Sequence, residues 1–179
     1  MKVAFYTLGC KANQYDTREM ISVLELRGHE IVDFEQAADV YIINSCTVTA
    51  ESDRKTRQII GRVHRPHPEA GVAVRGCYAQ RDAENVLKIE GVDAVAGSSG
   101  RGDIARVLAE AARQREAGGQ LNAVADYADS CAYEEAAPVS HERIRAHIKI
   151  QDGCDRRCTY CIIPYARGPV RSRSAEGIA

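Results

Sequence analysis

Cysteine is the residue type in this 179-residue chain with the most chemical potential, because thiolates bind soft metals and iron–sulfur clusters. The seven cysteines are Cys10, Cys46, Cys77, Cys131, Cys154, Cys158 and Cys161. The number is odd and no export signal precedes them, so a secreted disulfide framework is not expected. The pattern predicts a metal or catalytic role in a reducing, cytoplasmic setting, with no ligand role assigned to Cys131.

Cys10, Cys46 and Cys77 form the first cysteine site, and each follows a short apolar run and precedes a helical pattern. The carboxyl ends of parallel strands line one crevice, so these three thiols are expected to converge. Three thiolates leave zinc one ligand short, whereas on a [4Fe–4S] cluster they leave one iron open. Gly9 and Gly76 precede two of them and permit a close backbone approach. The alternative is that all three are small buried residues.

Cys154, Cys158 and Cys161 form the second cysteine site, a C-x3-C-x2-C sequence directly after a strand-like segment and a turn. Three cysteines within eight residues are a specific metal signal. His141 and His147 lie upstream, and we expect them to be surface or strand-packing residues. An iron–sulfur cluster with one open iron therefore fits better than zinc.

Strands and helices alternate along the first two-thirds of the chain. The hydrophobic pattern predicts strands at 3–8, 30–34, 40–43, 72–74 and 92–96 and helices at 13–26, 50–64, 79–89 and 103–114. This alternation predicts an α/β fold with a doubly wound, open parallel sheet of about five strands, over residues 1–117. Asn13 and Asp16 are expected to cap the first helix.

The rest of the chain reads as a linker and the start of a second unit. Residues 118–141 are rich in glycine and acidic residues, which is typical of a linker. Apolar residues alternate with polar residues over 144–150, which predicts a strand in a new unit. Residues 142–179 are too few to enclose their own core, so we expect the start of a truncated domain.

Charge and hydropathy exclude two classes of protein. The net charge of −1 excludes a strongly basic nucleic-acid module, and no apolar run approaches the ~20 residues of a membrane span. The arginines of the 50–64 helix are read as a solvated face. Arginines after residue 150 are read as phosphate-binding; they are Arg156, Arg157, Arg167, Arg171 and Arg173.

Four ordered segments resemble the radical S-adenosylmethionine methylthiotransferases. They are TLGCKANQY at 7–15, NSCTVT at 44–49, RGCYAQ at 75–80 and KIQDGCDRRCTYCIIPYARG at 149–168. The resemblance implies an α/β domain followed by the first strand and cluster loop of a radical S-adenosylmethionine barrel. The barrel's remainder and an RNA-binding β-domain are not present after residue 179, so an N-terminal fragment that is inactive alone is expected.

The resemblance also implies two [4Fe–4S] clusters and a cofactor. Cys10, Cys46 and Cys77 match the ligands of an auxiliary cluster. Cys154, Cys158 and Cys161 match the ligands of the cluster that binds S-adenosylmethionine and cleaves it to a 5′-deoxyadenosyl radical. Tyr160 matches the aromatic residue whose backbone lies beside the adenine. No side chain of this chain is implied as a separate catalytic residue.

The segments around Cys10 and Cys46 look most like the branch that methylthiolates N6-threonylcarbamoyladenosine next to the tRNA anticodon. Sister branches act on isopentenyladenosine in tRNA and on a ribosomal protein. The implied partners are the tRNA anticodon loop and a reducing electron donor, with no membrane and no prediction of oligomeric state. Two further readings stay open, a non-enzymatic metal-binding module and a thiol redox protein with paired cysteines.

Overall fold

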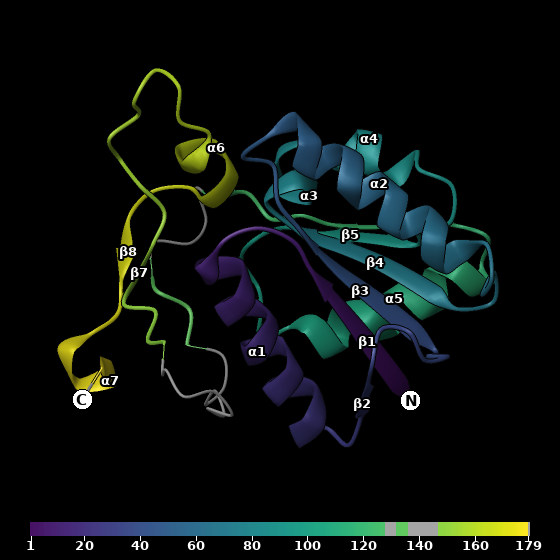
Figure 1. The fold of residues 1–179 in the computed structure, drawn as a ribbon. Coiled ribbons are helices and arrows are strands. Elements are labelled where there is room, and N and C mark those ends of the chain that lie inside the picture. The colour runs from purple at the N-terminus through teal and green to yellow at the C-terminus, as the bar shows by residue number, and fades with distance from the viewer. Residues whose placement is uncertain (128–131, 136–146, 179) are drawn as a thin grey trace.

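The computed structural model describes residues 1–127, 132–135 and 147–178 (Figure 1). The strands are β1 (Lys2–Thr7), β2 (Glu30–Val32), β3 (Val40–Ser45), β4 (Gly71–Gly76), β5 (Ala94–Ala96), β6 (Leu121–Ala123), β7 (Gln151–Asp152) and β8 (Arg171–Ser172). The helices are α1 (Lys11–Leu26), α2 (Ala50–His64), α3 (Cys77–Arg81), α4 (Ala83–Leu87), α5 (Ile104–Glu116), α6 (Ile163–Arg167) and α7 (Ala175–Ile178). None of these helices is long and apolar enough to cross a membrane.

The main sheet is parallel throughout, with the strand order β2-β1-β3-β4-β5-β6. The order reverses between β1 and β3, because the chain adds β2 on one side of β1 and all later strands on the other. In open α/β sheets such a reversal opens a crevice at the carboxyl ends of the strands. The fold therefore provides a ligand-binding position beside the ends of β1, β3 and β4.

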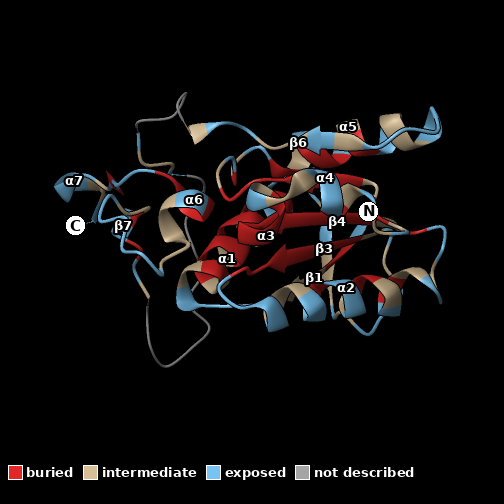
Figure 2. Ribbon diagram, turned by 90° about the horizontal axis from the view of Figure 1, so that it is seen from above, coloured by how far each residue is buried: buried red, intermediate tan, exposed pale blue. Residues whose placement is uncertain are grey.

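Two layers of helices cover the sheet. Residues of α2, α3 and α4, including Ile60 and Val86, form a core with alternate strand residues such as Ile43. On the other face, α1 and α5 contribute Met20 and Leu108 to a second core. Figure 2 shows the buried residues concentrated in the strands and the inner sides of these helices. The predicted doubly wound fold is confirmed.

Two details of the α/β domain differ from the expectation. The sheet has six strands, because Leu121–Ala123 pairs with β5 inside the segment predicted to be a linker. The predicted helix over 79–89 is two short helices, since the backbone leaves the helical region at Asp82 (φ −145°, ψ 49°). Val86 from the second of these is still fully buried, so the break redirects the chain without losing its core contact.

The described residues from 147 to 178, here called the second segment, pack at the carboxyl edge of the sheet, where α6 lies against α3 (Figure 1). The strand predicted over 144–150 is wrong in its described part: residues 147–150 are not a strand, and β7 begins at Gln151. The burial of its side chains is the opposite of what hydrophobicity favours. Lys149 is 8% exposed, whereas Ile148 and Ile150 are 56% and 54% exposed. Lys149 points inward because it pairs with the buried carboxylates of Asp16 and Asp152.

Candidate metal centres

The first cysteine site lies where three neighbouring strands end. In the register of the sheet, Ser45 of β3 pairs with Gly76 of β4, so Cys46 and Cys77 follow at the same level. Thr7 of β1 pairs with Asn44, and Cys10 follows shortly after it as the residue that precedes α1. The three cysteines therefore lie at one edge of the sheet, as the strand-end argument requires.

Asn13 ties two of these strand ends together. Its Nδ2 donates to the carbonyl oxygens of Leu8 (2.8 Å) and Ser45 (2.9 Å), which lie beside Cys10 and Cys46. Its Oδ1 lies 3.9 Å from the Sγ of Cys77. The predicted cap is wrong: Asn13 lies inside α1, where it is fully buried, and Cys10 occupies the N-cap position without a side-chain bond. Asn13 thus holds together the ends of β1 and β3, which carry Cys10 and Cys46.

Two glycines bring the backbone close to the thiols. Gly9 has φ +102°, and a Cβ placed on it would lie 2.9 Å from the Sγ of Cys46. Gly76 has φ +92°, and its Cβ would lie 2.5 Å from the Oδ1 of Asn44 and 2.6 Å from the backbone oxygen of Ser45. No side chain fits at either position, so the space around the thiols depends on both glycines.

The electrostatics differ among the three thiols. Cys46 and Cys77 are buried, whereas Cys10 is exposed. The pKa of Cys77 is raised to about 11, chiefly by burial; Arg167 opposes the rise, and the neighbouring Cys46 and Cys10 add to it. The thiol is therefore protonated in the metal-free chain at neutral pH. A bound metal would have to displace that proton.

A buried positive charge lies behind the same edge. Arg75 is 2% exposed and donates to the carbonyl oxygens of Gly97 (2.9 Å) and Ser99 (3.0 Å). No carboxylate of the described residues lies within ion-pair distance of it. Burial lowers the pKa of Arg75 to about 10, which leaves it charged at neutral pH. The nearby carboxylates of Asp16 and Glu134 favour its charged form.

The second cysteine site lies in the loop between β7 and α6. Cys154 and Cys161 are partly buried and Cys158 is exposed. The Cys161 N–H donates to the Cys158 carbonyl (2.9 Å), so the loop turns tightly between the last two cysteines, and Arg157, just before Cys158, has φ +44°. Tyr160 is 91% exposed. A cavity of about 250 Å³ opens beside Cys154, lined also by Tyr127, Asp155, Arg157, Pro164, Gly168 and Pro169.

The donor chemistry of both sites fits soft metal or iron–sulfur ligation. All six described cysteines are free thiols, so the disulfide-paired redox reading has no support from this part of the chain. Among the described residues, however, no three or more His, Cys, Asp or Glu side chains already form a metal-holding arrangement. The structure brings Cys10, Cys46 and Cys77 to one edge of the sheet, and their role as ligands belongs to the proposed function.

A buried ionic network connects the second segment to α1. Lys149 Nζ lies 2.6 Å from Oδ1 of Asp16 and 2.6 Å from Oδ2 of Asp152. Arg167 lies 2.9 Å from each of the same two carboxylates, through Nη2 and Nη1. Arg101 adds a contact to Glu19 (2.5 Å). All these side chains are at most 6% exposed.

The network holds its carboxylates ionised. Burial alone would raise the pKa of Asp16, but the charges of Arg167 and Lys149 outweigh burial and hold that pKa below its ordinary value. The same balance holds the pKa of Asp152 far below its ordinary value. Both carboxylates therefore stay charged and paired at neutral pH.

Comparison with known proteins shows which family the chain belongs to. A family model described as "Uncharacterized protein family UPF0004" matches residues 2–97, the segment that carries the first cysteine site. The chain belongs to this family.

Curated relatives of this UPF0004 protein extend over almost its whole length. It is 44% identical over 177 residues to the "Threonylcarbamoyladenosine tRNA methylthiotransferase MtaB" of Bacillus subtilis (strain 168), covering 98% of this chain and 39% of that protein. It is 40% identical to the protein of the same name from Aquifex aeolicus (strain VF5), covering 99% and 43%. It is 35% identical to the "tRNA-2-methylthio-N(6)-dimethylallyladenosine synthase" of Pseudothermotoga lettingae, covering 97% and 39%. The chain thus spans about two-fifths of the length of these relatives.

A solved structure also resembles the UPF0004 chain in outline. The isolated REC domain of RcsB from Salmonella enterica serovar Typhimurium, in the apo form, matches with a TM-score of 0.48 and 14% identity, over 68% of this chain and 92% of that domain.

Sequence reasoning missed the residues that dock the second segment of this UPF0004 protein. Asp16 is predicted at a helix cap and Arg167 at a phosphate, and no role is predicted for Lys149, yet all three are buried in one network. The one available signal was the clustering of Lys149, Asp152 and Arg167 around the second cysteine site. Cys131 and His141 lie outside the described residues, and His147 is partly buried.

Proposed function

We propose that this chain is part of a tRNA methylthiotransferase that uses radical S-adenosylmethionine chemistry. The observation that carries the proposal is the placement of three cysteines just after three adjacent strands at one edge of the sheet, in a family whose relatives are named methylthiotransferases. A second cysteine group directly follows in a loop docked at the same edge of the sheet. Two separate thiol sites in one chain are more than a single structural zinc site requires.

The residues present fit two [4Fe–4S] clusters. Cys10, Cys46 and Cys77 would hold one, and Cys154, Cys158 and Cys161 the other. When bound, these groups supply one electron to cleave S-adenosylmethionine and an open iron position for sulfur chemistry. The protein's own contribution is to exclude water around Cys46 and Cys77, to fix the strand ends through Asn13, and to leave Tyr160 on the open side of the second loop. Tyr160 is proposed, from the family resemblance, to lie beside the adenine.

The proposed substrate is N6-threonylcarbamoyladenosine next to the tRNA anticodon. Two relatives carrying that activity in their names are 44% and 40% identical to this chain. The relative named for dimethylallyladenosine is 35% identical. Dimethylallyladenosine in tRNA is therefore the second candidate substrate.

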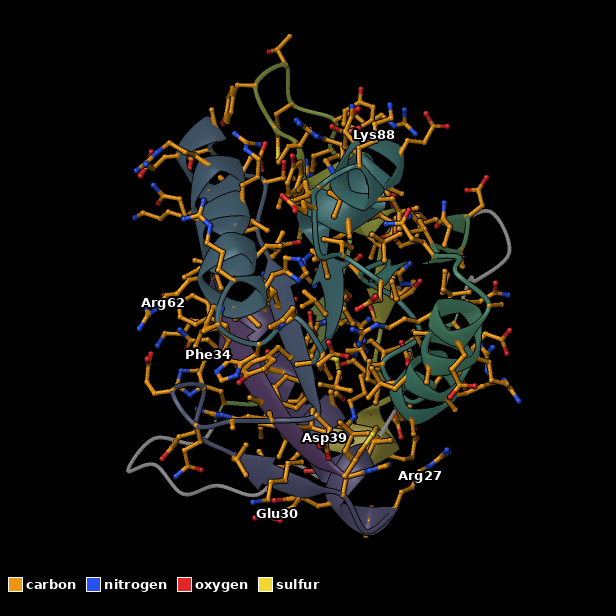
Figure 3. The ribbon with its side chains drawn as sticks, turned by 90° about the vertical axis from the view of Figure 1, so that its right-hand side faces the viewer. Arg27, Glu30, Phe34, Asp39, Arg62 and Lys88 are labelled. Carbon is orange, nitrogen blue, oxygen red and sulfur yellow. The ribbon has the colours of Figure 1, made fainter. Side chains whose placement is uncertain are left out.

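The arginine surfaces limit where RNA could bind. Arg167 and Arg171 are 3% and 6% exposed, so they are not free to hold phosphate, and the expectation that they do so is wrong. On α2, Arg62 pairs with Glu35 at 2.6 Å, and Figure 3 shows Arg62 on the outer side of that helix. Arg156 and Arg157, exposed in the second cysteine loop, remain available to a polyanion.

The division at residues 117 and 141 is also retained as a proposal, with residues 142–179 as the start of a radical S-adenosylmethionine domain. A chain spanning about two-fifths of its relatives is proposed to be inactive alone. The working enzyme is proposed to act in the cytoplasm with a reducing electron donor.

The test uses the full-length protein with each cysteine site replaced by alanine. Replacing Cys10, Cys46 and Cys77 should leave reductive formation of 5′-deoxyadenosine and abolish methylthiolated tRNA. Replacing Cys154, Cys158 and Cys161 should abolish both. Cys131→Ala is the matched control, because no role is assigned to that thiol.

Metal analysis separates the proposal from a non-enzymatic module. Anaerobically reconstituted protein should contain iron and sulfide close to two [4Fe–4S] equivalents, and each triple variant should lose one. A colourless protein that retains zinc, or a first-site variant that folds and still methylthiolates tRNA at the normal rate, would contradict the proposal.

A further inference from the structure

Arg167 is the residue of the second segment that reaches furthest into the first cysteine site. It is the last residue of α6 and is 3% exposed. Its Nη2 donates to Oδ1 of Asn13 at 2.5 Å and to Oδ2 of Asp16 at 2.9 Å, and its Nη1 donates to Oδ1 of Asp152 at 2.9 Å. One planar guanidinium therefore bridges α1 and the residue that ends β7.

The contact with Asn13 reaches the cysteines themselves. Both hydrogens of the Asn13 amide are committed to the carbonyls of Leu8 and Ser45, so its oxygen must face an external donor. Arg167 is that donor. The same Asn13 oxygen lies 3.9 Å from the Sγ of Cys77. Through Asn13, Arg167 is thus connected to the residues at the ends of β1 and β3 and to the thiol that follows β4.

Other contacts keep α6 in place without touching the cysteines. The Ser98 hydroxyl donates to the carbonyl of Ala166 (2.9 Å), as does the Tyr127 hydroxyl (2.7 Å). Lys149 separately pairs with Asp16. Docking of the second segment therefore has support besides Arg167, so the effect of Arg167 on the thiols can be measured apart from docking.

We propose that Arg167 is a positioning residue of the first cysteine site, supplied by the segment that carries the second site. It fixes Asn13 and Cys77 in the arrangement that receives the metal group, and it does so only while α6 is docked on the sheet. The first site is then complete only when the second cysteine loop is in place. The inference takes Cys10, Cys46 and Cys77 as a ligand set from the proposed function, but its geometry concerns the metal-free chain as well.

The first arm of the test measures thiol accessibility in the metal-free chain. Arg167→Gln should increase the rate of Cys77 alkylation by N-ethylmaleimide by about tenfold or more, because breaking a buried ionic contact promotes local opening, and this gain in exposure outweighs the loss of a cation that lowers the pKa of the thiol. Arg173→Gln is the matched control: Arg173 belongs to the same segment and pairs with Glu135 at the surface (3.1 Å). Mass spectrometry reads each cysteine separately, and amide exchange of β3 and β4 reports whether the sheet stays folded.

The second variant separates the guanidinium's geometry from its charge. Arg167→Lys keeps a cation for Asp16 and Asp152, so amide exchange of the second segment should stay near that of the unaltered chain. Lysine has one ammonium nitrogen, whereas the planar guanidinium of arginine donates from several, so lysine cannot reach Asn13 and Cys77 together. Cys77 should therefore still react faster than in the unaltered chain. Asn13→Ala should raise Cys77 reactivity too, and combining it with Arg167→Gln should add little.

Three outcomes would overturn the proposed role of Arg167. Cys77 reactivity in Arg167→Gln equal to that in Arg173→Gln would overturn it, as would full restoration by lysine or additive effects with Asn13→Ala. If Arg167→Gln fails to fold, Arg167→Lys and Asn13→Ala decide the question.

A second arm reads the electron paramagnetic resonance signal of the first-site cluster, reconstituted in a chain with Cys154, Cys158 and Cys161 replaced by alanine. The signal should change in Arg167→Lys and not in Arg173→Gln. Failure of any cluster to assemble would count against the proposed function, while the alkylation arm would still decide the role of Arg167.

Discussion

Arg167 and Asp16 form a buried ion pair, with Nη2 of the guanidinium 2.9 Å from Oδ2 of the carboxylate, although one lies at the end of α6 and the other in the first helix of the chain. Their side chains are 4% and 6% exposed. Asp16 also pairs with Lys149, so this one carboxylate holds two cations of the second segment.

Asp16→Asn should therefore destabilise the docked segment by about 3–5 kcal/mol, because it leaves Arg167 and Lys149 buried beside an uncharged partner. Amide exchange should show the loss in residues 147–178 and not in β3 or β4. Asp103→Asn, which removes an exposed ion pair with Arg106, should cost less than about 1 kcal/mol. Equal effects of the two variants in urea unfolding would contradict the structural role of the network.

Docking of the second segment should also weaken in acid. The pKa of Asp152 is held far below its ordinary value, chiefly because the charges of Arg167 and Lys149 outweigh burial. Because the pKa of Asp152 is lower in the folded chain than its unfolded value of 3.8, its ionised carboxylate stabilises the fold at pH values above 3.8. This contribution is lost as the pH falls below 3.8. Amide exchange of 147–178 should accelerate below about pH 4. Asp152→Asn should dock weakly at neutral pH and show a flatter pH profile; an unchanged profile would contradict the assignment.

At high pH the limiting group is Cys77. Burial raises the pKa of its thiol to about 11 from its ordinary value of 9.0, so folding favours the protonated thiol. The metal-free chain should therefore lose about 2–3 kcal/mol of stability between pH 9 and pH 11, a loss that begins at the unfolded pKa. Cys77→Ala should remove this part of the pH dependence. Urea unfolding of both chains across that range provides the measurement, and parallel curves would refute the prediction.

Gly76→Ala should disrupt the strand end that carries Cys77. Its backbone (φ +92°, ψ −157°) lies in a region used almost only by glycine, and an added Cβ would lie 2.5 Å from Asn44 Oδ1 and 2.6 Å from the Ser45 oxygen. We expect a loss of more than about 2 kcal/mol. Gly28→Ala is the control, because Gly28 has φ +79° with nothing within 4 Å of its Cβ position, and it should cost about 1 kcal/mol. If both variants lost a similar free energy of unfolding, the steric clash of the added Cβ at position 76 would contribute nothing.

The sequence by itself determined the α/β alternation and the edge at which the first cysteine site lies. Short apolar runs each followed by an amphipathic segment admit few arrangements, because parallel strands need right-handed helical crossovers. Cys10, Cys46 and Cys77 each follow such a run, so the topology fixes their common edge. The helix over 50–64 is likewise set locally, by Thr49 capping and the spacing of Ile60 and Val63.

Only the tertiary structure decided the partners of the buried charges. The alternation over 144–150 predicts a strand, but Lys149 is buried and the neighbouring isoleucines are exposed, because Asp16 and Asp152 offer Lys149 two buried carboxylates. Asn13 and Asp16 looked like capping residues, a local role, but they bond to residues far along the chain. Local patterns encode periodicity and hydrophobicity, whereas a buried ion pair depends on which distant groups the fold brings within about 3 Å.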